Sequence, residues 1–307
     1  STTFKYESSD EMGALFDLEK SGYFYSRLQN PTNDYVAQKI CDLEGGCAAM
    51  LLSSGQAANF YATFNICEAG DHMISSSAIY GGTFNLFGVT MKKLGIECTF
   101  IDPDASEEEI EAAIRPNTKL IFGETIANPA LTILDIEKFA NVAHRHGMPL
   151  IVDNTFATPV NCRPFEWGAD IVTHSTTKYM DGHAVALGGC IVDSGNFDWE
   201  AHADRYPGLT TPDESYHGII YTKKFGRAAY ITKATSQLMR DLGSMQSPQN
   251  AFLLNLGLES LALRVRKHCE NADKVAAYLN NNDKVAWVNY AGLPGNRYYD
   301  LARKYMP

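Results

Sequence analysis

The feature that most constrains the fold is a regular alternation between residues 49 and 192. Seven short apolar runs are separated by segments in which apolar residues recur every three or four positions. Short apolar runs are typical of buried strands, and the wider spacing is typical of amphipathic helices. The alternation predicts an α/β fold, with a mostly parallel seven-stranded sheet covered by helices on both faces. The predicted strands are AMLLSS, HMISS, ECTFID, KLIFGE, PLIVDN, DIVTHS and GGCIV.

The predicted helices within this region are QAANFYATFNIC, GTFNLFGVTMKKLG, SEEEIEAAIR and DIEKFANVAHRHG. Beyond it, segments 219–240 and 249–281 also show helical spacing. KVAWVNY, residues 284–290, is predicted to be a strand that opens a smaller C-terminal α/β domain. A second domain is expected because a chain of 307 residues is about as long as one hydrophobic core can serve.

Composition excludes several classes of function. The formal net charge of −10 argues against a nucleic-acid surface, which needs clustered Lys and Arg. No apolar run approaches the roughly 20 residues that span a bilayer, so an integral membrane protein is not expected. The seven cysteines are scattered, form no C-x-x-C pair and are interpreted as reduced thiols. The first residues contain acids and lack an apolar signal core, so we expect a cytoplasmic protein.

Polar residues end four of the predicted strands, although the apolar bodies of those strands do not require them. They are Ser53-Ser54-Gly55, Glu124, Asp153-Asn154 and His174-Ser175. Ligands of parallel sheets bind beyond the carboxyl ends of the strands. These strand ends are therefore where a binding site is expected.

LLSSGQAANF is a strand, a tight turn and a helix start. Free N–H groups at Gly55 and Gln56 could bind a phosphate there, or the turn could be an ordinary helix cap. A helix dipole contributes only about 0.3–1 kcal/mol, so a phosphate would also need an arginine. YSRLQNPT offers Tyr25 and Arg27, although a plain surface arginine is the alternative.

Asp153 and Lys178 each follow a buried strand. A buried carboxylate needs a partner, which for Asp153 could be a structural lysine, a metal or a ligand; no His/Asp/Glu spacing supports a metal. Lys178 could be solvated, or could lose hydration and become a carbonyl-reactive amine. Together with a phosphate site and Tyr80 at a helix start, these groups match the needs of pyridoxal 5'-phosphate (PLP).

Seven motifs point to the same cofactor. They occur in order over nearly the whole chain: YSRLQNPT, SSGQAA, YGGTFNLF, ETIANP, VDNTFATP, HSTTKYMDGH and PDESYHG. Together they resemble the Cys/Met-metabolism family of PLP-dependent enzymes, most of all its O-acetylhomoserine sulfhydrylase branch. The resemblance implies fold type I, the aspartate-aminotransferase architecture. The predicted division is an incomplete N-terminal arm over 1–30, a PLP-binding domain over 31–229 and an incomplete C-terminal domain over 230–307.

The resemblance also implies roles for individual residues. Lys178 would form the Schiff base, Asp153 would partner the ring nitrogen and Tyr80 would stack on the ring. Asn128 would lie near the ring hydroxyl and the substrate carboxylate. The phosphate would be held by Ser54, Gly55, Gln56, Ser175 and Thr177, and by Tyr25 and Arg27 of a neighbouring subunit. A homo-oligomer, as a dimer of dimers with shared sites, is therefore expected.

The implied reaction is the replacement of acetate by sulfide on O-acetylhomoserine. Methionine γ-lyase and cystathionine γ-synthase or γ-lyase are alternatives on the same scaffold. Methionine γ-lyases typically carry a cysteine two positions after the stacking tyrosine, where this chain has Gly82. A smaller residue there is expected to leave room for the nucleophile. An alternative from another class of function is a metabolite-binding protein without catalytic activity.

The chain departs from the family pattern at both ends. It begins after the family's usual N-terminal segment. It also stops before the stretch whose arginine grips the substrate carboxylate, so that arginine is expected to lie outside this sequence.

Overall fold

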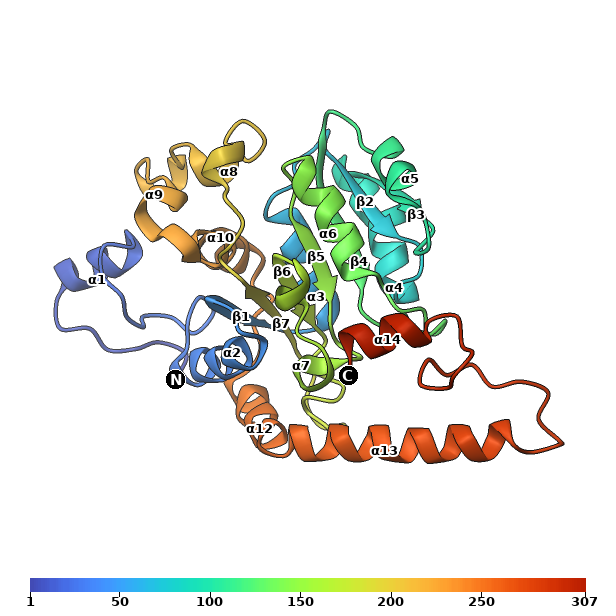
Figure 1. The fold of residues 1–307 in the computed structure, drawn as a ribbon. Coiled ribbons are helices and arrows are strands. Elements are labelled where there is room, and N and C mark those ends of the chain that lie inside the picture. The colour runs from blue at the N-terminus through green and yellow to red at the C-terminus, as the bar shows by residue number, and fades with distance from the viewer.

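A seven-stranded sheet forms the centre of the molecule (Figure 1). The computed structural model describes all residues from 1 to 307. The strands are β1 (Ala48–Leu52), β2 (His72–Ser76), β3 (Glu97–Ile101), β4 (Thr118–Glu124), β5 (Leu150–Asp153), β6 (Ile171–His174) and β7 (Gly189–Asp193). Each coincides with one of the seven apolar runs, which confirms the predicted strands.

The strand order is β1-β7-β6-β5-β4-β2-β3. The pairs from β6 through β5, β4 and β2 to β3 are parallel. Only β7 runs against its two neighbours, β6 and β1. β1 therefore points the same way as β4, β5 and β6, so the carboxyl ends of these four strands lie at one edge of the sheet.

Helices cover both faces of the sheet, as predicted. Leu120 and Phe122 of β4 face a core cluster that also contains residues of α3 and α10, while Ile121 faces a cluster formed with α6. Alternate side chains of a strand point to opposite faces, so one apolar strand supplies both cores. A third cluster packs α2 and α12 on the second face, beside β1, β6 and β7.

The longer helices are α1 (Ser9–Phe16), α2 (Pro31–Glu44), α3 (Gly55–Phe64), α5 (Glu107–Ala112), α6 (Ile136–Arg145), α12 (Pro248–Glu259), α13 (Leu261–Asn280) and α14 (Tyr299–Tyr305). The shorter α-helices are α4 (Gly81–Asn85), α7 (Thr158–Asn161), α8 (Pro207–Thr210), α9 (Tyr221–Phe225), α10 (Ala229–Lys233) and α11 (Arg240–Leu242). The π and 3-10 segments are η1 (Leu86–Thr90), η2 (Met91–Leu94), η3 (Pro164–Trp167), η4 (Glu200–His202), η5 (Glu214–Tyr216), η6 (Gly226–Ala228) and η7 (Ala234–Met239).

Some predicted helices are divided. The segment 82–95 is α4 followed by a π turn and a 3-10 turn, and 219–240 runs through α9, η6, α10 and η7 into α11. The segment 249–281 breaks at Ser260 into α12 and α13. α13 runs along the lower edge of the molecule and projects beyond its body (Figure 1).

The prediction of a strand at KVAWVNY was wrong, because residues 284–290 contain no strand. A strand needs a neighbouring strand to pair its backbone N–H and C=O groups. No strand of the sheet reaches this segment, and the side chain of Trp287 is left 78% exposed. The short apolar alternation therefore lacks the partner that would make it a strand.

The C-terminal helix α14 packs on the main sheet's second core. Tyr298 and Tyr305 are buried there, and the ring of Tyr305 meets Trp167 edge to face at 4.9 Å. The predicted division into segments at residues 30 and 229 stays a prediction. Among the helices of this chain, none is both long enough and apolar enough to cross a membrane.

Candidate active site

A pocket of about 650 Å³ opens at the edge where β1, β4, β5 and β6 end. It brings together nine of the eleven residues predicted for the site. These are Ser54, Gly55, Gln56, Tyr80, Asn128, Asp153, Ser175, Thr177 and Lys178. They come from five separate segments, each at or just after the carboxyl end of a strand. The sheet topology is therefore what assembles them.

The carboxyl group of Asp153 accepts three hydrogen bonds in the pocket. Asp153 is 7% exposed, and its Oδ2 accepts a hydrogen bond from Nδ2 of Asn59 at 3.1 Å. Its Oδ1 accepts from the backbone N of Thr155 at 3.0 Å and from the Thr155 hydroxyl at 2.5 Å. These three hydrogen bonds hold the Asp153 carboxyl group in a fixed orientation.

Asn59 and Thr155 were not predicted. Asn59 lies one turn into α3 and is buried, and its Oδ1 accepts a hydrogen bond from Thr173 at 2.6 Å. The sequence did contain a signal for Asn59. It is a polar side chain one turn after Gly55 and Gln56, in a helix expected to be buried. Thr155 could have been found as the residue two positions after Asp153, where a carboxylate commonly caps a turn.

Glu124 is a second buried carboxyl of the pocket, and it stands beside Asp153 in the paired register of β4 and β5. Its Oε2 accepts a hydrogen bond from the backbone N of Tyr80 at 2.6 Å. Burial, followed by the charge of Asp153, raises the pKa of Glu124 to about 9. The sequence marked Glu124 as a polar strand end without assigning it a role.

The start of α3 can bind an anion. Ser54 caps the helix by accepting from the backbone N of Ala57 at 3.1 Å, which leaves the N–H groups of Gly55 and Gln56 without intrahelical partners. A Cβ on Gly55 would lie 2.5 Å from Cβ of Ser175. The absence of a side chain at Gly55 therefore lets the turn after β6 approach the helix start, and the two segments form one cradle.

Thr177 contributes less than expected to this cradle. Its hydroxyl donates to the carbonyl of Gly188 and accepts from the backbone N of the same residue, both at 3.1 Å. The hydroxyl is therefore engaged in holding the chain before β7, although Thr177 does line the pocket.

Lys178 lies in the turn after β6, and its side chain is exposed within this chain. The position of Lys178 after an apolar strand predicted an amine dehydrated by burial, and one chain by itself does not provide that burial. The physical reason is that the pocket is open on the side of the loop 183–188, where Val185 and Leu187 are 62% and 61% exposed.

Arg264 of α13 holds the turn that carries Lys178, and it was also missed. Its guanidinium donates to the carbonyl of Tyr179 and to that of Gly257, each at 2.7 Å. Gly182 has a positive φ of +68°, and a Cβ there would lie 2.2 Å from Nη1 of Arg264. The turn is therefore wrapped closely around this arginine. No sequence signal links α13 to Lys178, because 86 positions separate the two residues.

Tyr80 lies at the N-cap of α4, with its side chain 47% exposed at the pocket. A Cβ on Gly82 would lie 2.6 Å from the Tyr80 ring. The expectation that Gly82 leaves room for a nucleophile was wrong, because the ring of Tyr80 already fills that space. A larger residue at this position would have to displace the ring.

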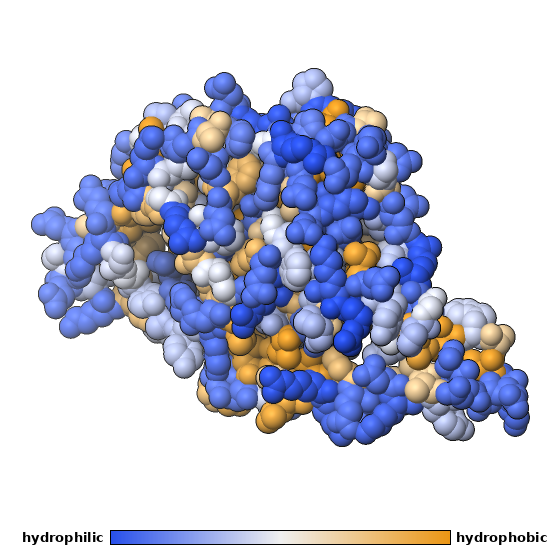
Figure 2. Space-filling view, in the orientation of Figure 1, coloured by the Kyte–Doolittle hydropathy of each residue, from blue (hydrophilic) through white to orange (hydrophobic).

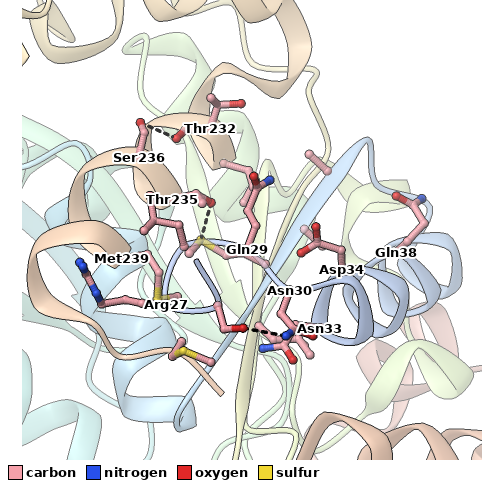
Figure 3. Close-up of a pocket in the computed structure, with 18 of the residues that line it drawn as sticks. Arg27, Gln29, Asn30, Asn33, Asp34, Gln38, Thr232, Thr235, Ser236 and Met239 are labelled. Atoms are coloured by element: carbon pink, nitrogen blue, oxygen red, sulfur yellow. Dashed lines mark hydrogen bonds between the residues drawn. The ribbon is translucent and has the colours of Figure 1, made fainter. Parts of the chain in front are cut away.

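Tyr25 and Arg27 do not join the pocket. Arg27 lines a different cavity, of about 320 Å³, between the N-terminal arm, α2, β1 and η7 (Figure 3). It donates to the carbonyl of Arg240, and its guanidinium carbon lies 5.2 Å from the centre of the Tyr25 ring. Within one chain these two residues are therefore separated from the other nine.

The residues of the larger pocket fit PLP. The cradle at Gly55 and Ser175 offers backbone N–H donors to a phosphate, and the buried anion of Asp153 matches a protonated ring nitrogen. The exposed ring of Tyr80 can stack, and the Lys178 amine can reach a carbonyl carbon. A volume of about 650 Å³ lies within the range of small-molecule sites.

Comparisons with known proteins agree with this fit. Residues 1–307 match the family described as Cys/Met metabolism PLP-dependent enzyme. The homocysteine/cysteine synthase of Saccharomyces cerevisiae is 44% identical over 306 residues, covering 99% of this chain and 69% of the relative. The O-acetyl-L-homoserine sulfhydrylase of Corynebacterium glutamicum is 45% identical over 307 residues, covering 99% and 70%.

Solved structures show the same similarity. A protein of Campylobacter jejuni described as an O-acetylhomoserine (thiol)-lyase matches with a TM-score of 0.96 and 41% identity, over 100% of this chain and 74% of that one. That structure holds a pyridoxyl-lysine phosphate group. The cystathionine gamma-lyase of Lactobacillus plantarum matches with a TM-score of 0.81 and 32% identity, over 100% and 69%.

Proposed function

The chain belongs to the family of Cys/Met metabolism PLP-dependent enzymes, and we propose that it converts O-acetylhomoserine and sulfide to homocysteine and acetate. Family membership makes PLP its cofactor and small molecules its substrates. The observation that carries the proposed reaction is the identity of 44–45% over 99% of the chain to relatives named for homocysteine synthesis and O-acetylhomoserine sulfhydrylation. The matched gamma-lyase structure is only 32% identical.

The roles proposed for the pocket residues follow from their contacts. Lys178 would carry the cofactor, because it is the only lysine that lines the pocket. Asp153 would pair with the ring nitrogen, because it is a buried anion oriented by Asn59 and Thr155. Tyr80 would cover one face of the ring, and Asn128 would stand near the ring hydroxyl and the substrate carboxylate.

The phosphate would lie in the cradle where α3 begins. The backbone N–H groups of Gly55 and Gln56 would donate to it, with Ser54, Ser175 and Thr177 around them. Because the Thr177 hydroxyl is already bonded to Gly188, we assign the larger part of the phosphate binding to the helix start and Ser175.

The proton steps are assigned to Lys178. When bound, the cofactor supplies an electron sink for the electron pair released at the substrate Cα. The Lys178 amine is held at the pocket by its turn. It would accept the proton from Cα, release it, and then accept a proton from Cβ. Acetate then leaves Cγ with its bonding pair, and sulfide takes its place there. After sulfide has added as HS⁻, the Lys178 ammonium would return protons to Cβ and Cα. Arg264 would keep the amine in reach by holding the carbonyl of Tyr179.

Gly82 disfavours the methionine γ-lyase alternative. A cysteine at this position, as the resemblance implies for methionine γ-lyases, would begin with a Cβ only 2.6 Å from the ring of Tyr80. The ring could then not stay where it is in this chain. The packing of Tyr80 on Gly82 therefore favours the sulfhydrylase reaction over the methionine γ-lyase reaction.

We also propose that the site is completed by a second copy of the chain, in a homo-oligomer of paired dimers. Tyr25 and Arg27 lie away from their own pocket, while a phosphate needs an arginine. Val185 and Leu187 expose apolar side chains at the pocket mouth, and Phe252 and Leu256 expose more on α12. Figure 2 shows apolar side chains gathered on the lower part of the molecule, near α12 and the start of α13. Such patches favour association.

A reducing compartment such as the cytoplasm is the proposed location. All seven cysteines are free thiols, and four of them are buried. Free thiols in this number are typical of proteins that work where disulfides do not form.

The proposed reaction is tested by product analysis under matched conditions. With O-acetylhomoserine and sulfide, the protein should release homocysteine faster than it releases 2-oxobutyrate from methionine. The Lys178→Ala variant serves as the control for catalysis outside the site. Rapid 2-oxobutyrate release with little homocysteine would assign the chain to the lyases instead. A protein that binds PLP with its visible absorbance but forms neither product would support the alternative without catalytic activity.

A further inference from the structure

Two acidic side chains stand next to each other at the cofactor edge, and the function proposed above uses only one of them. Glu124 is the last residue of β4 and Asp153 the last of β5, and the two are paired in register across these parallel strands. Both are buried, at 5% and 7% exposure. Two adjacent carboxylates without a cation between them cannot both ionise cheaply in a buried site.

The hydrogen bonds decide which of the two takes the charge. Asp153 accepts from Asn59 and twice from Thr155. Glu124 accepts from backbone N–H groups, of which the clearest is that of Tyr80 at 2.6 Å. The better-supported anion is Asp153. Its charge adds to burial in raising the pKa of Glu124 to about 9, while the backbone N–H groups of Tyr80 and Asn128 act in the opposite direction.

The other titratable groups of the pocket do not change this result. They are Tyr80, Lys178 and Tyr179 after β6, and Arg264 and His268 from α13. The shift in the pKa of Glu124 comes from burial, the charge of Asp153 and the backbone N–H groups of Tyr80 and Asn128. On the other side, β2 ends in Ser75 and Ser76, which do not titrate in the accessible range.

Glu124 also has a structural task. Tyr80 is the N-cap residue of α4, and its own side chain makes no capping hydrogen bond. Tyr80 is 47% exposed. The hydrogen bond from its backbone N to Glu124 therefore connects this end of α4 to the sheet. The position of the ring over the pocket therefore depends on Glu124.

We infer that Glu124 is a positioning residue that acts in its protonated form. Its neutral carboxyl holds the backbone of Tyr80, and its neutrality leaves Asp153 as the single anion of the two at this edge. The second effect rests on the proposed function, because it concerns the nitrogen of a bound PLP ring. The first effect belongs to the cofactor-free chain and does not depend on the reaction.

The cofactor-free chain gives a test with a defined sign. In the unfolded chain Glu124 ionises near its ordinary pKa of about 4.3. In the folded chain it keeps its proton up to a pKa of about 9. Its contribution to stability is therefore fully present at low pH and is lost as the pH rises toward 9. Within this window the folding equilibrium constant changes by at most about tenfold per pH unit for one proton.

The experiment compares the wild type with Glu124→Gln and Glu124→Ala, using denaturant unfolding of the cofactor-free chain between pH 6 and 8.5. Glutamine is neutral at every pH and keeps an oxygen for the Tyr80 N–H. We expect the wild type to lose stability relative to Glu124→Gln as the pH rises. Glu214→Gln, at an exposed glutamate, is the matched control and should follow the wild type.

PLP affinity of the same variants tests the positioning role. Glu124→Gln should bind PLP within about threefold of the wild type, and Glu124→Ala should bind about tenfold or more weakly, as expected for a lost buried hydrogen bond. A pH-independent difference between the wild type and Glu124→Gln would overturn the inference, and so would a glutamine variant as defective as alanine. If Glu124→Ala does not fold, the pH series of Glu124→Gln still decides. Failure to make homocysteine would overturn the proposed reaction and leave the stability result unaffected.

Discussion

Asn59 donates a hydrogen bond from its side-chain amide to Oδ2 of Asp153 over 3.1 Å. The oxygen of the same amide accepts from the hydroxyl of Thr173 at 2.6 Å, which settles the end of the amide that faces the carboxylate. α3 thereby fixes the orientation of the anion at the end of β5. The same helix begins with the proposed phosphate cradle, so one element positions both ends of the cofactor.

The first prediction concerns this contact. Asn59→Ala should weaken PLP binding by about tenfold to a hundredfold, because a hydrogen bond to a charged group contributes roughly 1.5–3 kcal/mol. PLP affinity is measured by titration of the cofactor-free protein. In the Asp153→Asn background the same substitution should have a much smaller effect, since the two residues act as one unit. Asn117→Ala, which removes a surface amide bonded to Gly70, is the control. Equal effects in both backgrounds would contradict the coupling.

The second prediction identifies the lysine that carries the cofactor. Borohydride reduction followed by peptide mapping should place the pyridoxyl group on Lys178. Lys233 is the sharpest competitor, because burial lowers its pKa to about 8 and so makes its amine more reactive. It lines a pocket of only about 40 Å³, too small for PLP, and donates to the carbonyl of Asn65. A label on Lys233, or on the exposed Lys223, would refute the assigned site.

A third prediction tests whether the site is shared between subunits. Arg27→Ala and Lys178→Ala should each be nearly inactive alone. Mixed oligomers should regain activity, because one of the hybrid sites then contains both an intact arginine and an intact lysine. Activity is measured after co-refolding, with mixed oligomers verified by two affinity tags. Mixing Lys178→Ala with Asp153→Asn provides the contrast: both residues line the same chain's pocket, so each site of that hybrid stays defective. Absence of rescue in verified mixed oligomers would mean that Arg27 serves its own chain.

The fourth prediction concerns the turn around Arg264. Arg264→Ala should speed hydrogen exchange of the amides in 178–188 and lower kcat by about tenfold or more, because two part-buried carbonyls lose a charged donor. KM should change less, since the turn positions the Lys178 amine. Arg264→Lys should restore the function only in part, because an ammonium cannot reproduce the planar fork. Arg266→Ala, at an exposed position two residues further along α13, is the control. Unchanged exchange in 178–188 would refute the role.

Local sequence pattern predicted the seven strands, the parallel architecture and the strand ends where the pocket lies. Asn128, by contrast, was predicted only from the resemblance to the family. A buried strand needs a short apolar run, and a residue placed just after such a run in a parallel sheet is carried to the ligand edge whatever the rest of the chain does. Asp153, Lys178 and the Gly55 turn were found in this way.

Contacts between distant parts of the chain could not be predicted from local pattern, because they arise when the fold brings those parts together. The hydrogen bond from Asn59 to Asp153 joins residues 94 positions apart, and the grip of Arg264 on Tyr179 spans 85. The register of β4 against β5 places Glu124 beside Asp153, and no local pattern specifies that register. The segment 284–290 shows the opposite case: it has strand-like residues but no neighbouring strand. Periodicity reports what one segment prefers, whereas pairing, charge and proton occupancy depend on which other segments the fold brings within a few ångströms.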